Sequence, residues 1–169
     1  MIRAAVPDDV PVIHALVREL ATYEREPDEV VATEADFRTA LFGESPRVHC
    51  LVACDDESGE VVGFAVYFLN FSTWLGTHGI YLEDLFVRPS ARGSGHGRAL
   101  LIELARIAVE RGYGRVEWSV LDWNTPAQGF YAGLGAVPMD EWTVWRLTGD
   151  ALQSLGGAGD SVPVTEGTE

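Results

Sequence analysis

A glycine-rich loop near the middle of the chain carries residue types that bind phosphate groups. It follows an apolar run that ends at Val87 and reads Arg92-Gly93-Ser94-Gly95-His96-Gly97-Arg98. Glycines at alternate positions let backbone N–H groups point into one cavity, and the helical pattern from Ala99 onward puts a helix N-terminus there. Two arginines can add charge-assisted hydrogen bonds. The loop predicts a pyrophosphate site, with a plain strand-to-helix turn as the alternative.

Two adjacent carboxylates, Glu83 and Asp84, lie in the apolar run just before this loop. Successive side chains of a strand point to opposite faces, so we expect only one of the two to face the anion site directly. A carboxylate there can bind a cation or accept its proton. The alternative is a half-buried acid pair whose oxygens accept hydrogen bonds from backbone donors.

Composition bounds the class of protein. The chain has 169 residues, is 47% hydrophobic and carries a formal net charge of -14, with arginine as its only basic residue type. The length predicts one domain. The net negative charge predicts an electrostatic field that repels nucleic acid and favours cationic ligands; the alternative is that the acidic residues only keep the protein soluble. No apolar run is long enough to cross a membrane, and the first residues lack signal-peptide anatomy, so we expect a cytoplasmic protein. Cys50 and Cys54 lack metal or redox spacing and are expected as buried thiols; no metal is expected.

The pattern of hydrophobic residues predicts the elements that position the loop. Helices are expected over residues 7–24, 34–42 (capped by Thr33), 95–111 (ending at Gly112) and 124–135, with a helical turn at 148–152. Strands are expected over 2–5, 48–53, 61–69, 79–88 and 116–121, with one or two more within 136–148. The order predicts an α+β fold: a central mixed, mainly antiparallel sheet flanked by helices, with a parallel step across the long helix. We expect one domain over 1–152 and a flexible acidic tail over 153–169.

Two motifs give the chain a family resemblance. The loop fits the R/Q-x-x-G-x-G/A pattern of the GNAT superfamily of acyl-CoA N-acyltransferases, and residues 124–136 (NTPAQGFYAGLGA) resemble that superfamily's later motif. A finer resemblance, to the diamine (spermidine/spermine) and thialysine N-acetyltransferase branch, reaches to about Leu152. It rests on residues 19–24 (ELATYE), 49–53 (HCLVA), 80–87 (IYLEDLFV) and 145–147 (WRL). It implies a GNAT-like fold, acetyl-CoA as co-substrate, a small primary amine as acceptor and a homodimer.

The resemblance also implies roles for individual residues. Acetyl transfer would proceed by direct attack of the amine in a ternary complex. Glu83 would be the base, acting through water, with Asp84 as a substrate-binding acid, and Tyr131 would protonate the leaving thiolate. His96 is expected to contribute backbone rather than act as a base, and the Val87 N–H is the best oxyanion donor. The residues expected to bind acetyl-CoA are Leu85, Phe86, Val87, Arg92, Gly93, Ser94, Gly95, His96, Gly97, Arg98, Asn124 and Tyr131.

The expected amine pocket is aromatic and acidic, since an aromatic face attracts a cation. Its members are Tyr23, Glu24, Trp74 and Trp145, together with the acid pair. Trp74 could instead anchor its loop, and Trp145 could be a core strand residue. The polyamine enzymes carry an acid two residues before the Trp74 position, where this chain has Ser72. That difference favours a shorter diamine or a lysine-like amino acid.

Two other functions fit the same motifs. A protein or peptide amine acetyltransferase of this fold would have an open, acidic groove around residues 72–78, whereas a small-amine enzyme would have a closed aromatic pocket there. A non-catalytic acyl-CoA-binding protein would keep the fold and lose the chemistry. The presence of Glu83, Asn124 and Tyr131 argues against that last alternative.

Overall fold

The computed structural model describes residues 1–157. These residues form two compact units, Met1–Val120 and a second that begins at Leu121. The first unit contains the strands β1 (Ile2–Ala4), β2 (Val48–Cys54), β3 (Val61–Ser72), β4 (Thr77–Val87) and β5 (Val116–Trp118). Its helices are α1 (Val10–Tyr23), α2 (Glu34–Phe42) and α3 (His96–Arg111), with short 3-10 turns η1 (Pro7–Asp9) and η2 (Pro89–Ala91). The second unit contains α4 (Thr125–Ala132) and α5 (Gly149–Gly157).

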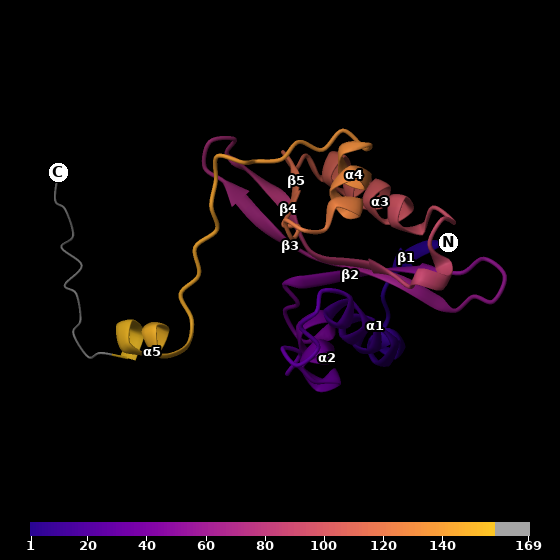
Figure 1. Ribbon diagram of the computed structural model, residues 1–169, viewed down its shortest axis with the longest axis horizontal. Coiled ribbons are helices and arrows are strands. Elements are labelled where there is room, and N and C mark those ends of the chain that lie inside the picture. The colour runs from indigo at the N-terminus through magenta and orange to yellow at the C-terminus, as the bar shows by residue number, and fades with distance from the viewer. Residues whose placement is uncertain (158–169) are drawn as a thin grey trace. The chain divides into compact units, whose positions relative to one another are not determined.

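The five strands form one mixed sheet in the order β1-β2-β3-β4-β5 (Figure 1). The first four pair antiparallel, and β5 pairs parallel with β4 after the crossover through α3. A parallel neighbour requires such a crossover, because a hairpin turn can join only antiparallel strands. The predicted α+β fold, its mainly antiparallel sheet and its parallel step across the long helix are confirmed.

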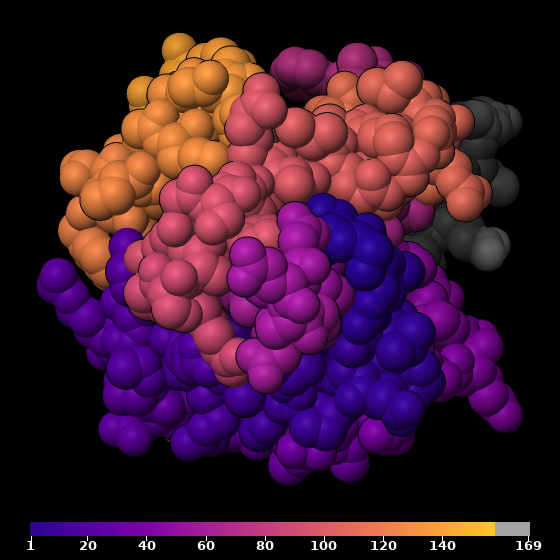
Figure 2. Space-filling view, turned by 90° about the vertical axis from the view of Figure 1, so that its right-hand side faces the viewer, coloured from indigo at the N-terminus to yellow at the C-terminus, as the bar shows by residue number. Residues whose placement is uncertain are grey.

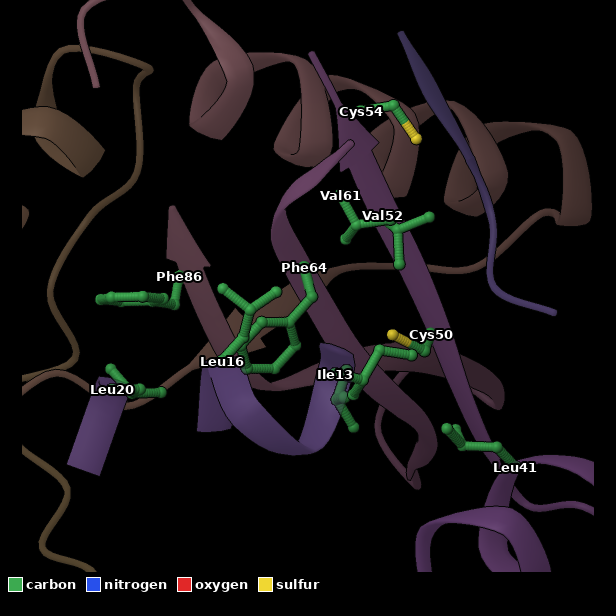
Figure 3. Packing of buried hydrophobic residues seen from close by; sticks show 11 residues of the cluster. Ile13, Leu16, Leu20, Leu41, Cys50, Val52, Cys54, Val61, Phe64 and Phe86 are labelled. Atoms are coloured by element: carbon green, nitrogen blue, oxygen red, sulfur yellow. The ribbon is translucent and has the colours of Figure 1, made fainter. Parts of the chain in front are cut away.

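The first face of the sheet packs against α1 and α2. Ile13 and Leu16 of α1 have no exposed surface and meet Phe64 of β3 and Phe86 of β4 in the cluster drawn in Figure 3. Cys50 and Cys54 are buried free thiols within that cluster, as expected. Thr33 caps α2 as predicted: its hydroxyl accepts from Asp36 N while the Asp36 carboxylate accepts from Thr33 N.

The second face of the sheet packs against α3, which lies on the side of the sheet opposite α1 and α2 (Figure 1). Leu100 and Leu104 of α3 are fully buried, as is Ile80 of β4. Gly112 ends the helix with a left-handed φ of 68°, and its N–H reaches back to Ala108 and Val109 carbonyls. This is the C-terminal arrangement that favours glycine, so the predicted end of this helix is confirmed.

A β-bulge interrupts the β3–β4 pairing at Glu83. Val66 pairs with Asp84, but the next residue of β3, Tyr67, pairs with Leu82, which leaves Glu83 as an extra residue. Cross-strand partners have their side chains on the same face of the sheet. Leu82 and Asp84 would share a face in a regular strand, but the bulge puts them on opposite faces. Leu82 therefore faces the α3 side, whereas Asp84 lies on the α1 side with Phe86.

Three predictions near the end of the described chain need correction. Residues 136–148 form no strand within the part of the chain that the structure describes, and several of their apolar side chains are exposed. Alternating apolar residues favour a strand, but a strand forms only where its backbone meets that of a neighbour. The strand expected over 116–121 ends at Trp118, and the helical turn expected at 148–152 is the longer α5. Of the predicted tail, residues 158–169 lie outside the described residues.

Candidate active site

The C-terminal half of β4 presents a free edge. β5 pairs only with Ile80, Tyr81 and Leu82, so beyond the bulge no strand among the described residues pairs with β4 on the side opposite β3. The Arg88 N–H donates to Val62 O on the β3 side, and N–H directions alternate along a strand. The N–H groups of Leu85 and Val87 therefore point to the free edge. A partner with amide or carbonyl groups can hydrogen-bond there as a further strand would.

The glycine loop follows that edge directly and opens α3. Gly93 and Gly95 have left-handed φ values of 85° and 83°, and a Cβ at either position would meet no atom within 4 Å. Glycine is thus needed for backbone conformation rather than to avoid crowding. No side chain caps the first N–H groups of α3 at Gly95. In Figure 2 this pink segment lies at the surface beside the purple β2–β3 turn. The open loop and uncapped helix start fit a pyrophosphate group.

Two arginines on either side of η2 contact α1, and the sequence did not predict either contact. The Arg92 guanidinium carbon lies 5.0 Å from the ring centroid of Tyr23 and 5.6 Å from that of Phe86. Arg92 Nε donates to Val87 O at 3.0 Å. Arg88 binds the Glu19 carboxylate through Nε and Nη2. Glu19 and Tyr23 lie far from these arginines in sequence, so no local spacing indicates either contact with α1.

Three carboxylates interact near the bulge. Asp84 is half-buried, and burial, followed by the charges of Glu83 and Glu24, raises the pKa of its carboxyl to about 6. Glu24 is the residue that ends α1, and burial raises the pKa of its carboxyl as well. Glu83, the extra residue of the bulge, is exposed. The first unit thus brings together four of the residues expected to bind an amine: Tyr23, Glu24, Glu83 and Asp84.

Trp74 does not join them within one chain. It occupies the turn between β3 and β4 and is 89% exposed. The six steps of extended chain from Thr77 to Glu83 put it roughly 20 Å from the bulge. Ser72 is buried in this turn, where its hydroxyl accepts a hydrogen bond from Leu75 N at 3.2 Å.

Three more of the predicted residues, Asn124, Tyr131 and Trp145, lie in the second unit. Asn124 is buried and caps α4 by accepting from Ala127 N. Tyr131 lies on α4 with its ring 5.3 Å from that of Phe130. The helix ends at Ala132, earlier than the predicted Gly135, whose φ is 89°. Trp145 is 92% exposed.

Other features of the described residues lie apart from this site. His96 is buried at the start of α3. A hollow of about 140 Å³ lies at the β1–β2 edge and includes none of the predicted site residues; it is lined by Ala4, Ala5, Leu41, Phe42, His49, Cys50, Leu51 and Tyr67. No group of three or more His, Cys, Asp or Glu side chains within residues 1–157 could hold a metal ion. None of the helices in that range is both long and apolar enough to span a membrane.

Comparison with known proteins identifies the family. Residues 13–136 match the acetyltransferase (GNAT) family. The chain is 39% identical to a Bos taurus thialysine N-epsilon-acetyltransferase, covering 93% of this chain and 97% of the relative. It is 35% identical to an Arabidopsis thaliana L-ornithine N5-acetyltransferase, covering 91% and 86% respectively. The chain belongs to the GNAT family and is an N-acetyltransferase of that family.

A solved structure supports the same fold. An integron cassette protein from the mobile metagenome of V. cholerae superimposes with a TM-score of 0.77 at 30% identity, over 92% of this chain and 96% of that one. The GNAT-like fold predicted from the two motifs is therefore confirmed.

Proposed function

We propose that this enzyme transfers an acetyl group from acetyl-CoA to the primary amine of a small cationic molecule, by direct attack in a ternary complex. The observation that carries the proposal is the juxtaposition, within one unit, of a free strand edge, an open glycine loop and a group of carboxylates. The edge and the loop suit a thioester with a pyrophosphate tail, and the carboxylates suit an ammonium group.

The donor would lie along the free edge. The N–H groups of Leu85 and Val87 face it, and the Val87 N–H is the best donor to the oxyanion that forms when the amine attacks the thioester carbon. The backbone of the loop from Arg92 to Gly97, with Arg92 and Arg98 side chains, would bind the pyrophosphate. GNAT acetyltransferases generally use acetyl-CoA, which fits these groups.

The acceptor amine must lose a proton before it can attack. An alkyl ammonium with a pKa near ~10 is protonated at neutral pH, so a base is needed. Glu83, exposed at the bulge, would take the proton through water, while Asp84, Glu24 and Tyr23 hold the cation. When the C–S bond breaks, the Tyr131 hydroxyl would give its proton to the thiolate, and Asn124 would help to hold the donor. The nitrogen loses its second proton to solvent as the amide forms, Glu83 releases the first to solvent, and Tyr131 regains one from solvent, so one proton is released in each turnover.

The acceptor would be a diamine, a polyamine or a lysine-like amino acid. The named relatives act on thialysine and ornithine, both of which carry a side-chain amine. The uncharged Ser72 in the β3–β4 turn favours the shorter members of this set. Trp74, which lies far from the bulge within one chain, would join the pocket only in an assembly such as the homodimer implied by the family branch, and Trp145 of the second unit is a further proposed member. Cytoplasmic residence stays a prediction.

The test is an acetyl-CoA turnover assay. Free thiol release is measured with diamines, polyamines, lysine, thialysine, ornithine and peptide amines as acceptors. The proposal predicts turnover with one or more small amines and none with peptides. Release with peptide amines alone would replace it with a protein-modifying function, and no release with any amine would refute the acetyl-transfer activity proposed here.

A further inference from the structure

Two arginines join the last turns of α1 to the connection between β4 and α3. Arg88 Nε lies 3.1 Å from each carboxylate oxygen of Glu19, and Arg88 Nη2 lies 2.8 Å from one of them. Four residues on, Arg92 covers the ring of Tyr23 and donates to Val87 O. One end of α1 is thus bound to both sides of η2, immediately before the glycine loop.

This contact connects the two halves of the proposed site. Tyr23 and Glu24, at the end of α1, belong to the amine side, whereas Val87 and the glycine loop belong to the donor side. We propose that Glu19 and Arg88 are positioning residues that hold the amine-binding end of α1 at a fixed place relative to the acetyl-CoA loop. The inference rests on the proposed function and deepens it, because it assigns the residues that set where the amine-binding groups lie relative to the donor.

The geometry of the pair suits positioning more than stability. The Arg88 and Glu19 side chains are 31% and 39% exposed, and ion pairs with that exposure contribute little to folding. A guanidinium that uses two nitrogens on one carboxylate does, however, restrict orientation as well as distance. By contrast, Arg106 pairs with Glu103 and Glu110 of its own helix, so that pair can orient nothing outside α3.

The first test separates the two substrates kinetically. In Glu19→Gln and Arg88→Gln, the KM for the amine is expected to rise about tenfold, because small displacements of a binding group are costly, while the KM for acetyl-CoA changes less than about twofold. The melting temperature should fall by no more than a few degrees. Glu103→Gln is the matched control and should alter neither KM. Unchanged amine KM in both variants, with an active wild type, would overturn the positioning role alone.

The second test distinguishes positioning from direct contact with the amine. The exchanged pair Glu19→Arg with Arg88→Glu restores the ion pair in reverse and should recover most of the lost amine affinity. If Glu19 itself touches the ammonium group, the exchanged enzyme puts a positive charge there and recovers nothing. That result would overturn the inference while leaving the proposed function intact.

The third test needs no turnover. Acetyl-CoA bound at the loop should slow hydrogen exchange at the Glu24 and Glu26 amides, which donate to Leu20 and Ala21 carbonyls at the end of α1. In Arg88→Gln this protection should disappear although acetyl-CoA still binds. Equal protection in wild type and variant, or none in either, would refute the proposed connection between α1 and the loop through Arg88. Failure of the wild type to bind acetyl-CoA would instead refute the proposed function, and the inference with it.

Discussion

Tyr131 is the proposed general acid, which protonates the leaving thiolate. Replacing it with phenylalanine keeps the ring packing beside Phe130 and removes only the hydroxyl. Loss of a general acid should lower kcat about 10²- to 10⁴-fold and leave acetyl-CoA affinity nearly unchanged. Steady-state kinetics with direct measurement of CoA binding check this. Tyr113→Phe, at the end of α3, is the control, and an unchanged kcat in Tyr131→Phe would remove Tyr131 from the mechanism.

Glu83 differs from Asp84 in exposure, which predicts different consequences when each is neutralised. Glu83→Gln should lower activity most near neutral pH and recover part of it above about pH 9, where free amine becomes abundant. The pH dependence of kcat/KM provides the measurement, with Glu110→Gln as the control. A uniform loss across the whole pH range would indicate that Glu83 binds substrate instead of accepting the proton.

Asp84 predicts a pH-dependent stability. Its pKa is raised from 3.8 to about 6 in the folded chain, so the folded state holds this proton more tightly than the unfolded state. Its contribution to stability is full below about pH 3.8 and is lost as the pH rises through about 6. Asp84→Asn does not ionise and should be about 1–3 kcal/mol more stable than wild type at pH 8, with little difference at low pH.

Urea denaturation of the Asp84→Asn variant and of the wild type at about pH 3.5 and at pH 8 measures this difference. The exposed Asp28→Asn variant is the control and should follow the wild type at both pH values. The same Asp84 substitution should weaken amine binding. The ionised Asp84 of the wild type would therefore lower the stability of the fold and raise the affinity for the amine. Equal stability of variant and wild type at pH 8 would contradict the assigned environment of Asp84.

At the scale of elements, the glycine loop gives the sharpest prediction. Gly95→Ala puts a Cβ on a residue with a left-handed φ and should cost about 1–2 kcal/mol of stability. It should also raise the KM for acetyl-CoA. Gly59→Ala, in the β2–β3 turn with a φ of 73°, carries the same backbone cost and should leave that KM unchanged. Equal KM values in the two variants would argue against a pyrophosphate at the loop.

The elements that sequence predicted well are those whose signals are local. Thr33 caps α2 through Asp36, three residues away, and Gly112 ends α3 through its own left-handed conformation. The features it missed depend on residues distant in the chain. The bulge at Glu83 needs the register of β3, Arg88 finds Glu19 only in the folded chain, and the alternation of residues 136–148 could not reveal whether a neighbouring strand is present.

At the scale of the whole molecule, the prediction concerns assembly. Trp142, Val144 and Trp145 are 70%, 79% and 92% exposed, although burial of such side chains is strongly favourable. A homodimer, as the family branch implies, would provide a surface for them. Light scattering should give twice the chain mass of 18.4 kDa at micromolar concentration. A mass of one chain, with full activity, would contradict this and leave Trp74 outside the amine pocket.

The extra residue in β4 serves the proposed site rather than the sheet. Leu82 and Asp84 pair with consecutive residues of β3, so they lie on opposite faces as neighbours in a regular strand do. Deleting Glu83 would make them neighbours in sequence as well, and it would leave Ile80 and Leu82 on the α3 side and Asp84 and Phe86 on the α1 side. The sheet should therefore fold without a residue at position 83, whereas the proposed proton transfer should not occur without its carboxylate. In descendants of this sequence, activity rather than folding would preserve the inserted residue.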